Sequence, residues 1–146
     1  MMRPPFMRAA TIVVAVAAIV GCSDVVSLSE DGPIGDYTAI ILYSTTTTGQ
    51  RDELANSGTF TITLKEDGTT SGRLRLVAFG GNPAVDADMA GTWTRNGDTI
   101  DFTQSADTFV RDMTFTIEQI TDRIWYLVGD DVFAGTRINV RLAQDS

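Results

Sequence analysis

The chain has 146 residues, and its 19 acidic against 11 basic side chains give a formal net charge of −8 at pH 7. So acidic a chain is repelled by the phosphates of nucleic acids, which argues against a nucleic-acid partner. It contains no histidine, and this excludes Ser-His-Asp and Cys-His catalysis together with most zinc, copper and haem sites. A pair of carboxylates could still perform acid-base hydrolysis, but nothing in the sequence places two of them together. We expect no catalytic residues, no metal site and no cofactor, and hence no enzyme.

The first segment has the composition of an export signal. Arg3 and Arg8 precede an apolar run at residues 9–20, and a basic start followed by a short apolar core is typical of signal peptides. The run is shorter than the about 20 apolar residues that a membrane-crossing helix needs. We predict that residues 1–21 are removed as a signal peptide, which leaves a chain of single-domain size.

The predicted leader ends at Ile19-Val20-Gly21-Cys22, which contains the only cysteine of the chain. This tetrapeptide resembles the lipobox of bacterial lipoproteins, in which an aliphatic, a variable and a small residue precede the cysteine. The resemblance implies diacylation of the Cys22 sulfur, cleavage before Cys22 and acylation of the new amino terminus. Two or three acyl chains give stable anchoring, because each buried methylene contributes about 0.8 kcal/mol. The alternative is an ordinary signal peptide followed by a free thiol.

Residues 22–35 form the predicted tether between the lipid and the domain. They are rich in Ser, Asp and Gly and show no sustained period. Lipoproteins kept at the inner membrane tend to carry aspartate after the cysteine, whereas this chain has Ser23. Resemblance to that sorting rule implies a protein that is anchored to the outer membrane and faces the periplasm. The membrane is then its first partner.

From Asp36 onward the pattern is that of β-strands, with threonine, β-branched and aromatic residues in short runs separated by Gly, Asn and Asp. Thr59–Leu64 alternates threonine with apolar residues, and Asp67-Gly68 supplies the positive φ values of a tight hairpin. Asn96-Gly97 predicts a second tight hairpin turn of the same kind. No helix is expected. The predicted strands are residues 37–43, 59–64 and 73–76, the two arms of a hairpin within 90–103, and residues 111–117, 124–128 and 136–142.

About eight short strands joined in sequence predict an all-β fold, an antiparallel up-and-down meander. Such sheets usually close to remove their edges, so a barrel is the first choice and a β-sandwich the alternative. The pattern resembles the small lipocalin-like domains of bacterial lipoproteins. Gly35-Asp36-Tyr37 is similar to their opening motif, and Gly91-Thr92-Trp93 to a hairpin in mid-domain. The resemblance implies one barrel domain over residues 36–143.

In a meander, alternate connections lie at opposite ends of the barrel. Tight turns at Asp67-Gly68, Asn96-Gly97 and Thr121-Asp122 share one end. The other end, which we call the mouth, carries the longer connections at residues 44–57, 80–88, 105–107 and 129–131. Loops on a rigid scaffold are where binding usually resides. Because the first strand runs toward the mouth, we expect the tether at the tight-turn end and the mouth pointing away from the membrane.

The mouth connections are rich in charge: they carry Arg51 and seven carboxylates, which are Asp52, Glu53, Asp86, Asp88, Asp107, Asp130 and Asp131. Several carboxylates at one rim can hold a hard cation such as calcium. Their spacing matches no calcium-loop motif, however, and solvated loop charge is the interpretation that we favour.

The barrel interior offers another route to a ligand. An eight-stranded barrel is just wide enough to be filled by its own side chains or to hold one small ligand. If it holds one, the large aromatic residues of the interior are the predicted contacts: Phe60, Trp93, Phe102 and Phe115. Two functions remain open. One is the binding of a small hydrophobic or amphipathic molecule, which requires a void of at least about 300 Å³. The other is a structural lipoprotein with a self-filled core that contacts another envelope protein.

Overall fold

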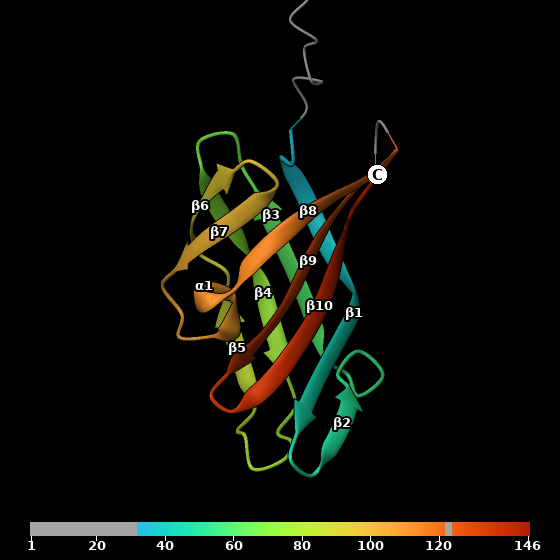
Figure 1. The fold of residues 1–146 in the computed structure, drawn as a ribbon. Helices are drawn as coiled ribbons and strands as arrows, with labels where there is room; N and C mark the ends of the chain where they lie inside the picture. Colours follow the sequence, from blue (N-terminus) through green and yellow to red (C-terminus); the bar gives the residue numbers. More distant parts are fainter. Residues whose placement is uncertain (1–31, 122–123) are drawn as a thin grey trace, which may run out of the picture.

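The computed structural model describes residues 32–121 and 124–146, and the predicted signal peptide and Cys22 lie outside these residues. The described residues form ten strands and one helical turn (Figure 1). The strands before the helical turn are β1 (Gly35–Thr46), β2 (Gly49–Asp52), β3 (Thr59–Leu64), β4 (Thr69–Leu76), β5 (Val85–Asp88), β6 (Gly91–Asn96) and β7 (Thr99–Gln104). They are followed by α1 (Phe109–Asp112), β8 (Thr114–Thr121), β9 (Ile124–Phe133) and β10 (Thr136–Gln144). No helix among the described residues is long and apolar enough to cross a bilayer.

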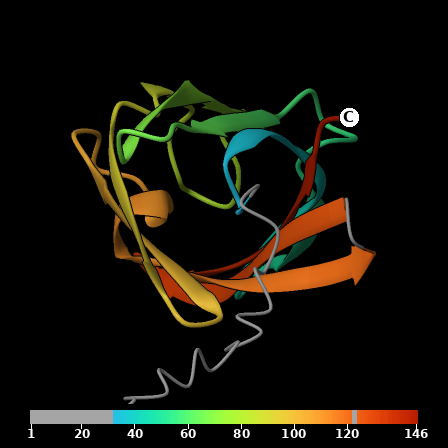
Figure 2. The same ribbon diagram turned by 90° about the horizontal axis from the view of Figure 1, so that it is seen from above.

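Eight of the strands close into a barrel in the order β10-β9-β8-β7-β6-β4-β3-β1, each antiparallel to the next. Closure comes from β1 and β10, which pair from Tyr37↔Gln144 to Thr45↔Arg137 (Figures 1 and 2). β2 and β5 are short additions that pair with β1 and β4. The predicted all-β up-and-down barrel is therefore confirmed over the sandwich alternative.

The period-two pattern decides which side chains fill the barrel. In β3 the apolar residues of the alternation are buried and two of the three threonines are exposed, as expected for a strand with one dry face. The sequence of β1 has apolar residues at both alternating positions, as in Ala39-Ile40-Ile41-Leu42, and the structure shows why. The register of β1 shifts between Ala39 and Ile41, so that Ala39 and Leu42 both point inward while Ile40 stays 50% exposed. A bulge of this kind re-aims the residues that follow it.

The barrel wall divides at Gly72 of β4. On the tight-turn side, β4 pairs with β6 through Thr69 and Thr70. Beyond Gly72, β4 pairs instead with β5, and the amide of Met89 donates to the Gly72 carbonyl over 3.0 Å at the changeover. Gly72 has a φ of +133°, and a Cβ there would collide with the carbonyl oxygen of Thr61 on β3. Glycine is therefore required at this position.

The prediction places the strand expected at residues 111–117 too early. The observed strand β8 begins at Thr114, because Phe109–Asp112 form the helical turn α1. Phe109 and Val110 are both buried. Adjacent residues of a strand point to opposite faces, so a single helical turn is what allows both side chains to face the interior. Figure 2 shows α1 within the outline of the barrel.

The expected mouth loop at residues 129–131 is wrong, because β9 continues through these residues to Phe133. Gly129 pairs with Val140 of β10. A side chain there would collide with the sulfur of Met113 and lie 3.1 Å from the Phe115 ring, so this glycine makes room for core packing and does not mark a turn. The turn follows at Ala134 and Gly135, both with positive φ.

The other turns that can be placed lie at the two ends as predicted, and the predicted turn at Thr121-Asp122 extends beyond the described residues. The β3–β4 and β6–β7 turns lie at the end where β1 begins, and the β1–β2 and β9–β10 turns lie at the opposite end (Figure 1). Two of the expected mouth loops contain short strands, since β2 falls within residues 44–57 and β5 within 80–88. The first strand runs toward the mouth, as expected.

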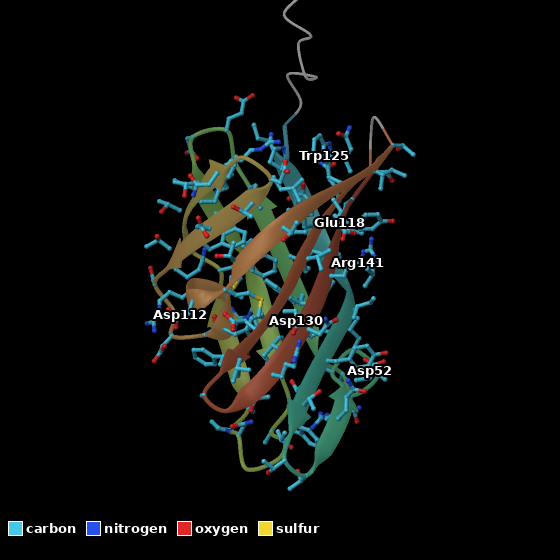
Figure 3. The ribbon with its side chains drawn as sticks, viewed as in Figure 1. Asp52, Asp112, Glu118, Trp125, Asp130 and Arg141 are labelled. Atoms are coloured by element: carbon cyan, nitrogen blue, oxygen red, sulfur yellow. The ribbon has the colours of Figure 1, made fainter. Side chains whose placement is uncertain are left out.

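Charged side chains on the outer wall pair across strands. Arg141 of β10 reaches over β9 to Glu118 of β8, with Nη2 2.6 Å from Oε2, and its guanidinium lies 4.5 Å from the centre of the Tyr126 ring (Figure 3). Asp130 and Arg137 form a two-bond pair at 2.8 and 2.7 Å, and the hydrogen bond from Arg137 holds the pKa of Asp130 below its ordinary value. The outer wall is thus polar and the interior apolar.

Substituting Gly72 by alanine should lower the free energy of unfolding by at least about 2 kcal/mol, because it adds backbone strain to the collision with Thr61. Gly97→Ala is the matched control. Gly97 also has a positive φ of +63°, but nothing lies within 4 Å of its added Cβ, so its cost should be about 1 kcal/mol. Urea unfolding followed by circular dichroism measures both, and equal costs would contradict the role of the collision.

Tyr37 predicts a dependence of stability on alkaline pH. Its ring is fully buried, its hydroxyl donates to the Pro33 carbonyl over 2.9 Å, and burial raises its pKa above the ordinary value. The unfolded chain releases this proton above about pH 10 while the folded protein keeps it, so stability is complete below pH 10 and is lost above it. Between pH 10 and 11 the free energy of unfolding should fall by about 1 kcal/mol from this residue alone. Tyr37→Phe should lack that component in urea titrations.

Candidate ligand-binding cavity at the barrel mouth

A cavity of about 330 Å³ opens into the mouth end of the barrel. Its walls come from β4, β9, β10, the β4–β5 loop and the segment before α1. They are mainly apolar, with a few polar groups among them. The lining residues are Ser44, Glu53, Leu74, Leu76, Val77, Phe79, Asn82, Pro83, Val85, Asp107, Thr108, Phe109, Phe133, Ala134, Thr136 and Ile138.

The inner boundary of the cavity is set by α1. Phe109 lines the cavity and is only 3% exposed. Its ring meets the ring of Phe60 edge to face, with centroids 5.9 Å apart. Phe60 lies on β3 and does not line the cavity. The helical turn therefore separates the cavity from the packed core on the side of the tight-turn end.

The β4–β5 loop, residues 77–84, is held over the mouth from two sides. The Asn82 side-chain amide donates to the Thr136 hydroxyl of β10 over 2.7 Å. On the other side, Arg51 of β2 donates to the Ala78 carbonyl over 3.0 Å, and its guanidinium lies 5.1 Å from the centre of the Phe79 ring. The loop is a fixed part of the cavity wall in this structure.

Glu53 is a buried carboxylate in the wall of the cavity, and its side chain is 2% exposed. Its backbone is fixed, because its amide donates to the Leu42 carbonyl over 2.8 Å and its own carbonyl accepts from Asn56 at 3.1 Å and Gly58 at 2.7 Å. Gly58 must be glycine, since a Cβ there would lie 2.7 Å from the Glu53 carbonyl oxygen. The tight turn after β2 therefore directs Glu53 inward.

The Glu53 carboxylate has one ionic partner. Arg51 Nε lies 3.6 Å from Glu53 Oε2, which makes an ion pair, but the two atoms are too far apart for a hydrogen bond. Within the described residues, Oε2 is buried without a hydrogen-bond partner, and so is the Thr108 hydroxyl in the same cavity wall. A buried polar group without a partner costs about 1–3 kcal/mol.

The four predicted ligand contacts do not line this cavity. Phe60, Phe102 and Phe115 are buried in the core, where the Phe102 and Phe115 rings meet edge to face at 5.2 Å. Trp93 is partly buried, and its indole N–H donates to the Lys65 carbonyl over 3.0 Å at the tight-turn end. The structure thus brings Phe102 and Phe115 together as core residues and leaves the contacts of the mouth cavity to other side chains.

Five of the seven predicted mouth carboxylates pair with arginines, and the other two, Asp52 and Asp131, accept hydrogen bonds from backbone amides. Asp86 accepts from Arg73 Nε at 2.7 Å, and this hydrogen bond holds its pKa below the ordinary value. Asp107 pairs with Arg111 at 2.8 Å, and the pKa of Arg111 is raised by its hydrogen bond to Asp112 and by the charge of Asp107. In the part of the chain that the structure describes, no group of three carboxylate or cysteine side chains is placed to hold a metal ion.

Sequence reasoning placed Glu53 among the solvated mouth charges and missed its burial. It also missed Thr108 and Phe109, which stand in a segment too short for a helical period. A local signal for Glu53 exists in hindsight: Asn56-Ser57-Gly58 follows it closely, and Ser57 has a positive φ of 69°. Such a sequence is typical of a tight turn. Because this turn follows β2 directly, it fixes the direction of the Glu53 side chain at its start.

The chain was compared with models of protein families, with curated proteins and with solved structures, and none of the three comparisons gave a match. The function of the cavity therefore has to be argued from its own geometry.

Proposed function

We propose that this protein is a lipid-anchored lipoprotein of the bacterial envelope whose barrel binds a small amphipathic molecule at its mouth. The observation that carries the proposal is the cavity of about 330 Å³. Ligand sites in proteins are apolar hollows of about 300–1,000 Å³ with a few placed polar groups. The mouth cavity has this composition, and its volume lies at the lower end of that range.

The volume limits the size of the ligand. At about 30 Å³ for each water-sized group, a cavity of 330 Å³ holds about eleven such groups. Leu74, Phe109 and Ile138 supply an apolar wall for an aliphatic or small aromatic body. The proposed ligand is therefore a small amphipathic molecule and not a full-length lipid.

The proposed orientation follows from the position of β1. The strand begins at Gly35 at the tight-turn end, so a lipid on Cys22 would hold that end toward the membrane (Figure 1). Residues 22–35 span at most roughly 45 Å when extended. The cavity at the other end would then open away from the bilayer, toward soluble molecules of the periplasm.

Closure of the barrel counts against the alternative of a structural lipoprotein that pairs with a partner through an open sheet edge. Both end strands of the meander are joined to each other, so the long edges that β-strand addition would use are paired. Among the described residues, the additions β2 and β5 have four residues each and pair on one side only. The exposed large apolar residues Ile40, Val77, Ile124 and Val132 lie on β1, in the β4–β5 loop and toward the two ends of β9. They are dispersed and do not lie on one strand face.

Filling the cavity tests the proposed binding. Leu76 is partly buried and lines the cavity, so Leu76→Trp should place its indole in the space of the ligand. Native mass spectrometry of the protein isolated from its host membranes should detect a bound small molecule in the wild type. The bound fraction should fall at least tenfold in Leu76→Trp, a loss of about 1.4 kcal/mol.

The control is Ile40→Trp, which adds the same ring at a residue that is 50% exposed on the outer wall and should leave the bound fraction unchanged. A wild-type protein that carries no small molecule, or a Leu76→Trp variant that keeps it, would refute the proposal.

The proposed anchoring has a separate test. Cys22→Ser should move the protein from the membrane fraction to the soluble periplasmic fraction once the leader is cleaved, because the serine hydroxyl cannot take the thioether-linked lipid. The circular dichroism of the barrel should not change, since the first strand of the barrel begins only at Gly35. Retention of a cleaved Cys22→Ser protein in the membrane fraction would show that the lipobox assignment is wrong.

A further inference from the structure

Two residues of the cavity wall, Glu53 and Thr108, each carry a buried side-chain oxygen that has no hydrogen-bond partner among the described residues: Oε2 of Glu53 and the hydroxyl of Thr108. Arg51 Nε, 3.6 Å from Glu53 Oε2, is a third buried atom without a hydrogen bond. Native proteins contain few such groups, because each costs about 1–3 kcal/mol. Glu53 and Thr108 come from different elements, the turn after β2 and the segment before α1. Their common location in the wall of one cavity indicates a ligand that supplies the missing hydrogen bonds.

We propose that the cavity selects an aliphatic molecule with an uncharged, hydrogen-bond-donating head, a hydroxyl or a primary amide, and that the Glu53 carboxylate accepts the hydrogen bond from that head. This inference rests on the proposed function of ligand binding at the mouth. It adds the chemical class of the ligand and the residue that recognises it.

The expected charge of the ligand head follows from the ion pair between Glu53 and Arg51. Arg51 lies 3.6 Å from Oε2, so the buried pair carries no net charge. An anionic head would place a second negative charge beside Glu53 in a low-dielectric site, and a cationic head would add an unbalanced positive charge there, and both are costly. An ionised carboxylate accepts hydrogen bonds and cannot donate them. An uncharged donor is the head that satisfies Glu53 without adding charge.

The surroundings of Glu53 hold the acceptor in place. Its backbone is fixed at both the amide and the carbonyl. Arg51 is held in turn by the Ala78 carbonyl and the Phe79 ring. The terminal torsion of a glutamate is broad, so the carboxylate can turn either oxygen toward the cavity while Arg51 stays beside it. Thr108 supplies a hydroxyl that can accept or donate a second bond.

Four octyl compounds test the assignment: 1-octanol, 1-methoxyoctane, octanoate and octylammonium. They share one chain and differ in the head, which is respectively a neutral donor, a neutral acceptor, an anion and a cation. The full chain is held in amphipol, and binding is followed by methyl NMR shifts of Leu74 and Ile138, which line the cavity. 1-Octanol should bind at least tenfold more tightly than each of the other three.

The matched variants are Glu53→Gln and Glu66→Gln. Both remove one carboxylate, but Glu66 is exposed between β3 and β4, at the tight-turn end. For each compound, the ratio of affinities between variant and wild type cancels its partition into amphipol. Glu53→Gln should reduce the preference for 1-octanol over 1-methoxyoctane to threefold or less and should improve octanoate binding, because the acceptor loses its charge. Glu66→Gln should leave all ratios unchanged.

The outcomes separate the two proposals. If all four compounds shift the methyl signals with equal affinity, the mouth binds ligands but the assignment to Glu53 is overturned. Tighter binding of octanoate or octylammonium overturns it as well. If none of the four compounds binds, both this inference and the proposed function fail. Should Glu53→Gln not fold, the series on the wild-type protein decides alone, with each affinity corrected for the partition of that compound into protein-free amphipol.

Discussion

Pairing between β1 and β10 is the constraint on which the rest of the structure depends. These strands lie at the two ends of the described chain, and eight residue pairs join them. Without this contact the meander would be an open sheet with one unpaired edge at each side. Closure also gives the sheet an inner face. The apolar residues at every second position of each strand point to that face and together form the core. The bulge in β1 belongs to the same constraint, because it keeps Ala39 and Leu42 directed inward while the strand follows β10 around the barrel.

The cavity is a consequence of how the wall divides at Gly72. Because β4 leaves β6 at that residue and takes β5 as its partner, the β6–β7 hairpin does not line the mouth end. α1 occupies part of the interior beside it and packs Phe109 against Phe60. What remains between α1, β4, β10 and the β4–β5 loop is the cavity. An eight-stranded barrel has little interior volume to spare, and here the interior toward the tight-turn end is filled by side chains and the mouth is not.

The strands could be predicted from the sequence because alternation and turn residues are local signals. Thr59–Leu64 and the Asn96-Gly97 turn needed no knowledge of the rest of the chain. The errors arose where a tertiary contact overrides the local pattern. Gly129 resembles a turn residue, but it is small because the sulfur of Met113 occupies the space where its side chain would stand. The predicted interior residues Phe60, Phe102 and Phe115 are buried, yet which of the interior positions border a void depends on packing that no single strand encodes.

Glu53 and Arg51 form an ion pair in which the carboxylate is 2% exposed and the guanidinium side chain 13% exposed. A buried ion pair seldom adds stability over apolar residues of the same shape, because the cost of removing both charges from water offsets their attraction. At the mouth the pair also lacks ideal geometry, with 3.6 Å between its atoms. Arg51 does more than balance Glu53, since it connects β2 to the β4–β5 loop through the Ala78 carbonyl and the Phe79 ring. A change in the hydrogen bonding of Glu53 would therefore reach that loop through one side chain. In the proposed complex, the same pair would link the ligand head to the loop that covers the cavity, a role that an apolar pair of equal size could not fill.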